Sequence, residues 1–300
     1  MKDHLPSLET LTVHGLGRLA EPYRDLVPPI HLSTTFERAG DGSYPGGRVY
    51  SRDASPAYDE VEEVLRQLEG GAQALLFGSG MAAASAVLQA LEPGARIVAP
   101  RSMYWALRKW LLDFTANWHI DLAFYDNAGE SNLADLERQL VAAPTRLLWI
   151  ETPANPGWEV TDIRAAAELA HRHGALVVVD STVSTPVLTQ PLELGADIVM
   201  HSATKYLNGH SDVVAAAQMH GGFGGMLSIR LAGGEGRARD FAARLQVFRR
   251  ATSLGCVESL VEHRASVEGP GTLCPPDLLR LSIGIEPVAD LLADLNQALE

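Results

Sequence analysis

Lys205 lies among residue types that together can bind an aldehyde cofactor. Asp180 ends the apolar run 175–179, and Lys205 follows 25 residues later, just behind the hydroxyl groups of Ser202 and Thr204. A lysine amine can form a Schiff base, hydroxyl groups beside it can bind a phosphate, and a carboxylate can keep a pyridine nitrogen protonated. An isolated lysine after a strand is usually a solvated charge, but this combination indicates a pyridoxal 5′-phosphate (PLP) site.

Helices and strands that can position these groups alternate from residue 56 onward. Ser55 can cap a helix that starts at Pro56 and stops at Gly70-Gly71. Short apolar runs then recur, separated by helical segments such as 162–172, at residues 74–77, 97–99, 122–125, 147–150, 175–179 and 198–200. Runs of this kind predict a mostly parallel α/β sheet. The ligand site of such a sheet lies at the carboxyl ends of the strands, where both Asp180 and Lys205 fall.

The pattern changes after residue 217 and predicts a smaller α+β carboxyl-terminal domain. A glycine-rich segment at 221–225 leads into a strand at 226–231, and helical stretches at 237–245 and 287–299 flank the apolar run 278–285. We therefore expect three parts: an amino-terminal arm over 1–55, a PLP-binding α/β domain over 56–217, and a shortened carboxyl-terminal domain over 218–300.

Composition excludes several classes of partner. The chain has 300 residues, of which 46% are hydrophobic and 20% charged, and a net charge of −13 without a run of Lys or Arg. These values predict a globular protein and argue against nucleic acid or an anionic membrane as partner. Residues 1–15 carry Asp3, His4 and Glu9 and no continuous apolar stretch, so we expect neither a signal peptide nor a membrane span, and a cytoplasmic location.

No metal site is expected. Cys256 and Cys274 fit no metal-ligand spacing and are too few for a disulfide framework, and the ten histidines show no ligand pattern.

The turn Gly78-Ser79-Gly80-Met81 follows an apolar run and opens a helix, so its backbone N–H groups can bind a phosphate. Together with Ala82-Ala83 it also satisfies the dinucleotide-binding pattern of a nicotinamide dehydrogenase. That alternative requires an acidic residue at the end of the next strand. The run 97–99 instead continues into Pro100-Arg101, which favours the phosphate of PLP.

The stretch from Asp180 to Asp212, which contains His201-Ser202-Ala203-Thr204-Lys205-Tyr206, resembles the Cys/Met-metabolism family of PLP enzymes. This family includes cystathionine γ-synthase, cystathionine γ- and β-lyases and methionine γ-lyase. The resemblance implies the PLP-dependent transferase-like fold, aspartate aminotransferase fold type I, with the cofactor on Lys205. It also implies an amino-acid substrate, namely a homoserine ester, cysteine or cystathionine, and a homodimer or homotetramer.

The resemblance also assigns roles around the cofactor. The residues that match those binding the cofactor phosphate in the family are Gly80, Met81, Ser202 and Thr204. Tyr50 and Arg52 match a tyrosine and an arginine that reach the phosphate of a neighbouring subunit. The cofactor ring is matched by Asp180 at the pyridinium nitrogen, by Thr182 near the ring face, and by Tyr104, which stacks on the ring and exchanges a proton with the substrate. Asn155 matches a residue near the ring oxygen and the substrate carboxylate, which Ser253 and Arg280 also bind; arginine suits a carboxylate because its guanidinium engages both oxygens.

Departures from the family pattern narrow the expected activity. Trp105-Ala106 after Tyr104 lacks the cysteine of methionine γ-lyase. By resemblance to members of the family, Leu254 and Glu258 favour γ-replacement or γ-elimination over the cystathionine β-lyase reaction. At residues 213–219 two segments abut that the family separates by several elements. The alternative activities are those of a cystathionine β-lyase or a methionine γ-lyase. Because of the missing elements, the alternative of another class is a catalytically impaired remnant that binds PLP or a partner subunit.

Overall fold

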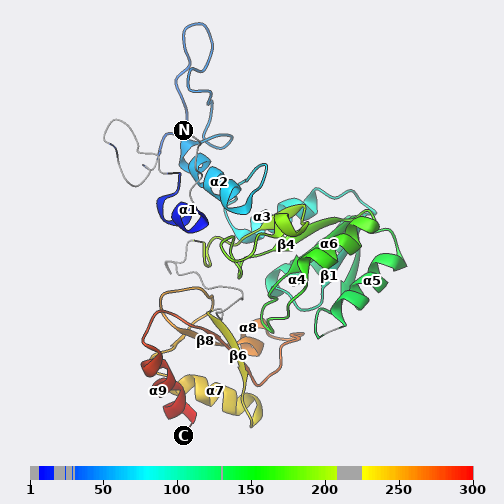
Figure 1. The fold of residues 1–300 in the computed structure, drawn as a ribbon, viewed down its shortest axis with the longest axis vertical. Helices are drawn as coiled ribbons and strands as arrows, with labels where there is room; N and C mark the ends of the chain where they lie inside the picture. Colours follow the sequence, from blue (N-terminus) through cyan, green and yellow to red (C-terminus); the bar gives the residue numbers. More distant parts are fainter. Residues whose placement is uncertain are drawn as a thin grey trace. The chain divides into compact units, whose positions relative to one another are not determined.

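The computed structural model describes residues 7–16, 24, 29, 31–129, 131–207 and 225–299. The chain divides into two compact units, residues 1–77 and 78–300, and each is described by itself (Figure 1). The expected junction at 213–219 and the glycines at 221–224 lie outside the described residues.

The amino-terminal unit contains helix α1 (Leu8–His14) in contact with helix α2 (Pro56–Glu69). Ser55 caps α2 by accepting a hydrogen bond from the backbone N–H of Ala57, and Gly70 ends it at a φ of 66°, in the left-handed region that favours glycine. The predicted start and end of this helix are confirmed.

The expected strand over residues 74–77 is wrong. Among the residues that the structure describes, no strand pairs with this segment, and the backbone N–H of Leu76 donates to the side chain of Glu62 instead. A strand exists only where a neighbour accepts its backbone hydrogen bonds, so an apolar run without a partner stays extended but unpaired.

Five parallel strands among the described residues form the larger sheet, in the order β2-β1-β3-β4-β5. They are β1 (Arg96–Pro100), β2 (Asp121–Tyr125), β3 (Leu147–Glu151), β4 (Leu176–Asp180) and β5 (Ile198–Met200), with the short 3₁₀ helix η1 (Pro191–Leu194) before β5. All five strands coincide with predicted apolar runs. The prediction of a mostly parallel α/β sheet is confirmed.

Helices cover both faces of this sheet, which explains why its strands are apolar apart from charged residues at their ends. Helices α3 (Gly80–Gln89) and α4 (Trp105–Trp118) pack on one face, around the buried Trp149. Helices α5 (Asn132–Ala142) and α6 (Ile163–Arg172) pack on the other face, around Ile150. The helices therefore cover the faces of the sheet, and the loops that follow the strands lie at the carboxyl ends of the strands.

The carboxyl-terminal part holds a smaller sheet in the order β6-β9-β8-β7. Its elements are β6 (Met226–Arg230), α7 (Gly234–Arg244), β7 (Arg249–Arg250), β8 (Leu260–His263), α8 (Arg264–Glu268), β9 (Leu278–Ser282) and α9 (Val288–Leu299). Helices α7 and α9, yellow and red in Figure 1, lie side by side and bury one face of the sheet. The predicted smaller α+β domain is confirmed.

The other face of this sheet carries a polar row. Ser228 of β6 and Glu262 of β8 are the direct partners of Arg280 in the central strand β9. Because side chains alternate along a strand, Leu279 and Leu281 point into the core while Arg280 points away from it. Ser228 accepts a hydrogen bond from Trp158 and donates one to the carbonyl of Pro156, so the row faces the loop after β3.

Candidate active site

A cavity of about 260 Å³ lies at the carboxyl ends of the strands. The predicted site residues that lie beyond residue 77 all line it: Gly80, Met81, Tyr104, Asn155, Asp180, Thr182, Ser202, Thr204, Lys205, Ser253 and Arg280. These residues come from separate strands, loops and both sheets, and the fold brings them together.

One end of the cavity has the chemistry of a phosphate site. Ser79 caps α3 by accepting a hydrogen bond from the N–H of Ala82 at 3.1 Å, and the hydroxyl oxygens of Ser202 and Thr204 lie 3.0 Å apart. Gly80 packs so closely against Ser202 that an added Cβ would meet the Ser202 side chain at 2.8 Å. Hydroxyl groups beside the start of a helix form an anion site, and the absence of a side chain at 80 keeps them together.

Asp180 lies at the end of β4 and is buried. Its Oδ1 accepts hydrogen bonds from the backbone N–H of Thr182 at 3.0 Å and from the Thr182 hydroxyl at 2.5 Å. The Thr182 Oγ1 accepts in turn from the backbone N–H of Ser202 at 2.8 Å, which connects the acid to the phosphate end. Burial raises the pKa of Asp180. A cationic ring nitrogen beside it would stabilise the carboxylate form.

The Lys205 amine points to Ser253, with Nζ 3.0 Å from the hydroxyl oxygen. Burial, followed by the positive charge of Arg280, lowers the pKa of Lys205. A lowered pKa increases the fraction of neutral amine, and the neutral form is the one that attacks a carbonyl.

Glu151 is a site residue that the sequence reasoning missed. It ends β3, directly opposite Asp180 in the sheet, and it lines the cavity. Its Oε2 accepts from the backbone N–H of Tyr104 at 2.6 Å and its Oε1 from that of Asn155 at 2.8 Å, so one carboxyl group fixes both segments. Burial and the nearby Asp180 raise the pKa of Glu151. The available signal was its position, an acid at the end of a buried strand like Asp180.

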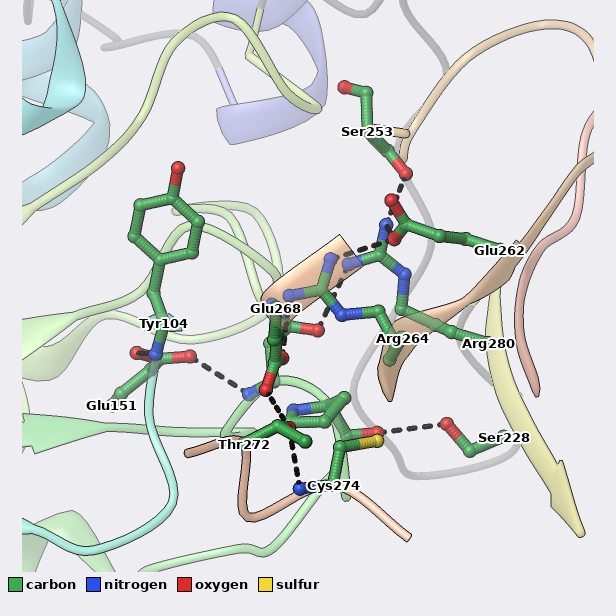
Figure 2. A network of polar contacts seen from close by, with 12 residues as sticks. Tyr104, Glu151, Ser228, Ser253, Glu262, Arg264, Glu268, Thr272, Cys274 and Arg280 are labelled. Atoms are coloured by element: carbon green, nitrogen blue, oxygen red, sulfur yellow. Dashed lines mark hydrogen bonds and ion pairs between the residues drawn. The ribbon is translucent and has the colours of Figure 1, made fainter. Parts of the chain in front are cut away.

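Arg280 is 4% exposed and also lines the cavity. Figure 2 shows its side chain between Ser253 and Glu262. Its Nη1 donates to the side-chain oxygen of Asn155 at 3.0 Å, and its Nη2 donates to the backbone carbonyl of Ser253 at 2.7 Å. Burial lowers the pKa of Arg280 to about 10, so the guanidinium remains charged at neutral pH. A charged group with five N–H donors, placed near Lys205, suits a carboxylate.

The sequence model of the Cys/Met metabolism PLP-dependent enzyme family matches residues 9–219 and 215–300 of the chain. The chain belongs to this family. The match consists of two parts that meet at residues 215–219, where the sequence places the missing stretch.

Relatives within the family align over most of the chain. Cystathionine gamma-synthase of Mycobacterium leprae is 34% identical over 383 residues, covering 98% of this chain and 97% of the relative. L-methionine gamma-lyase of Pseudomonas putida is 31% identical over 394 residues, covering 99% of this chain and 98% of the relative. Both alignments are longer than the 300 residues of this chain, as a deletion within it requires.

A solved structure shows the same fold. The crystal structure of cystathionine gamma synthase from Xanthomonas oryzae in complex with cystathionine has a TM-score of 0.88 and 31% sequence identity. That likeness covers 99% of this chain and 98% of the other. The expected fold class, a PLP-dependent enzyme of fold type I, is confirmed.

The residues present fit the cofactor of the family. The hydroxyl pair beside Gly80 suits its phosphate, the buried Asp180 suits its ring nitrogen, and the Lys205 amine suits its aldehyde. Tyr104 lies directly before α4 and lines the same cavity, where an aromatic ring can stack on a second ring.

Two predicted site residues belong to the amino-terminal unit. Tyr50 is partly exposed, and the guanidinium of Arg52 lies 5.2 Å from the centre of its ring. Their role at a neighbouring subunit's phosphate stays a prediction. Cys256 and Cys274 are both buried.

None of the described helices is long and apolar enough to cross a membrane.

Proposed function

We propose that the chain is a PLP-dependent carbon–sulfur enzyme of sulfur amino-acid metabolism that carries out γ-replacement or γ-elimination on homoserine-derived substrates. The observation that carries this proposal is the single cavity that joins the Lys205 amine, the Asp180 carboxyl group and the Arg280 guanidinium. The cystathionine gamma-synthases among its relatives support the class of reaction. We further propose an acylated homoserine, cysteine or cystathionine as substrate and the cytoplasm as location.

When bound, PLP supplies an electron sink for the negative charge that develops on the substrate next to the amine. Lys205 would hold the cofactor and, once released by the substrate amine, would remove the protons from Cα and Cβ of the substrate and later return protons there, because its amine lies within the cavity and burial lowers its pKa. Asp180 would hold a proton at the ring nitrogen. Tyr104 exchanges a proton with the sulfur or oxygen leaving group.

Arg280 and Asn155 bind the α-carboxylate at the opposite end and fix the substrate in one orientation. The hydrogen bond between their side chains holds both groups at that end before the substrate arrives. Thr182 donates a hydrogen bond to Asp180. Ser253 accepts one from the Lys205 amine.

A turnover assay tests the proposal. The purified chain is given cysteine with an acylated homoserine, and separately cystathionine alone, while cystathionine, 2-oxobutyrate and pyruvate are measured. Formation of cystathionine or 2-oxobutyrate that is lost in Lys205→Ala supports the proposal. Pyruvate from cystathionine as the main product would indicate the β-lyase reaction instead. Methanethiol released in a third incubation, with methionine alone, would indicate a methionine γ-lyase.

The second candidate is a catalytically impaired PLP-binding remnant or partner subunit. The two-part match to the family favours it, because the relatives have residues between the two parts that have no counterpart in this chain. The complete set of cavity residues opposes it. A chain that binds PLP through Lys205 but turns over none of these substrates would be such a remnant.

A further inference from the structure

Three further charged side chains lie buried next to Arg280: Glu262, Arg264 and Glu268. With Arg280 they form what we call the charge row. Their side chains are 4–5% exposed. None of these three residues was a candidate from the sequence, and only Arg264 also lines the cavity.

The charge row alternates in sign (Figure 2). The Oε2 of Glu262 accepts from Arg280 Nη2 at 2.5 Å and from Arg264 Nη1 at 2.8 Å. The Arg264 Nη2 donates to Glu268 Oε1 at 2.8 Å. The Thr272 hydroxyl donates to the other oxygen of Glu268 at 2.5 Å, so Glu268 has a neutral donor besides Arg264.

Glu262 lies directly beside Arg280 in the sheet and is ion-paired with it. The two residues are direct cross-strand partners in β8 and β9, and their side chains point to the same face of the sheet. Of the two Nη2 hydrogens of Arg280, one goes to Glu262 and one to the carbonyl of Ser253. A substrate carboxylate must therefore bind to an arginine that already has a carboxylate neighbour.

Arg264 changes the net charge around Arg280. Without it, Glu262 and Glu268 would carry two negative charges against the single positive charge of Arg280, and a third carboxylate would be repelled. With it, the negative charge of Glu262 is shared between two guanidinium groups. Burial increases the effect, because charges interact more strongly away from water.

We propose that Arg264 is a positioning residue for the substrate carboxylate: it neutralises Glu262, so that the charge of Arg280 stays available to the substrate. The inference rests on the proposed function, since it takes Arg280 as the carboxylate site. It assigns to Arg264 a part in substrate affinity without contact with the reacting atoms.

Two stable cofactor adducts separate this role from cofactor binding. One is the reduced adduct of PLP with L-alanine, and the other is the reduced adduct with ethylamine, which lacks only the carboxylate. The dissociation constants of both are measured by calorimetry on the full chain freed of PLP. The ratio of the two constants reports the contribution of the carboxylate alone, and the ethylamine adduct shows whether each variant is folded.

In Arg264→Gln we expect the preference for the carboxylate adduct to fall about tenfold or more, since one unit charge is removed one side chain away from the carboxylate. The double variant Arg264→Gln with Glu262→Gln should regain most of the preference, because the excess negative charge is removed as well. Arg264→Lys should retain part of it.

Glu268→Gln is the matched control, because it removes another ion pair of the charge row, the one between Arg264 and Glu268. It leaves the row more positive, so the preference should be unchanged or increased. A purely structural role predicts instead that Arg264→Gln and Glu268→Gln both reduce it. That result, or an unchanged ratio in Arg264→Gln, overturns the assignment. A wild-type chain that binds neither adduct overturns the proposed function, and the role of Arg264 with it.

Discussion

Glu151 and Asp180 end neighbouring strands and face each other in the sheet beneath the cavity. Burial raises the pKa of both, and the charge of Asp180 raises that of Glu151 further. Two carboxyl groups so placed resist ionising together. In the cofactor-free chain at least one of them keeps its proton at neutral pH.

This pair gives the cofactor-free protein a defined pH dependence. An acid whose pKa is raised on folding keeps its proton to a higher pH in the folded chain than in the unfolded one. Stability is therefore lost as the pH rises from the unfolded-state pKa to the folded-state pKa. We expect the free energy of unfolding to fall by roughly 2–4 kcal/mol between about pH 5 and 8. Urea unfolding at a series of pH values measures it, and Asp180→Asn should flatten the curve. A wild-type stability that rises with pH over this interval, or an unchanged curve in Asp180→Asn, would contradict the account.

The sequence predicted the residues whose chemistry is recognisable by type. Lys205, Asp180 and the hydroxyls before Lys205 were candidates from their spacing, and Arg280 came from the family resemblance. The position of Glu151 at the end of a buried strand was a signal, but its role, like that of Arg264, depends on which residues lie opposite it. Strand register and cross-strand neighbours are properties of the folded sheet, and a single sequence does not encode them in a local pattern.

At the scale of elements, the turn before α3 fits the phosphate end of the cavity because Gly80 has no side chain. The same turn offers a matched control, since an added Cβ at Gly78 would meet nothing within 4 Å.

We expect Gly80→Ala to weaken PLP binding by about tenfold or more, because the methyl group pushes Ser202 out of place at a cost of about 1–3 kcal/mol. Gly78→Ala should bind PLP like the wild type. Equilibrium titration of the cofactor-free variants with PLP, followed by absorbance, measures both. Equal affinities in the two variants would show that the close contact at Gly80 has no part in the phosphate site.

The elements themselves were largely predictable. Apolar runs bounded by Gly, Pro and capping residues gave the positions of β1 to β5, and Ser55 with Gly70 gave both ends of α2. The run 74–77 has the same composition but no partner strand among the described residues. Composition indicates that a segment can form a strand, whereas the hydrogen bonds that make it one come from a distant part of the chain.

In the assembled protein, we expect neighbouring subunits to share each active site. If Tyr50 and Arg52 complete the phosphate site of a neighbouring subunit, activity requires at least a dimer. An Arg52→Ala subunit and a Lys205→Ala subunit should then each be inactive, while their mixture regains activity on subunit exchange, because one site of each heterodimer has both groups. Turnover of the mixed proteins measures it, with native mass spectrometry to confirm exchange. Heterodimers without activity would show that Arg52 does not serve a partner's site.

We expect this chain to hold PLP through Lys205. The chain contains three lysines, Lys2, Lys109 and Lys205. Reduction of the PLP-loaded protein with borohydride, followed by proteolysis and mass spectrometry, fixes the cofactor to the lysine that bound it. The account predicts a phosphopyridoxyl group on Lys205 and on neither of the others. A label on Lys2 or Lys109 alone, or no label in protein that was saturated with PLP, would contradict it.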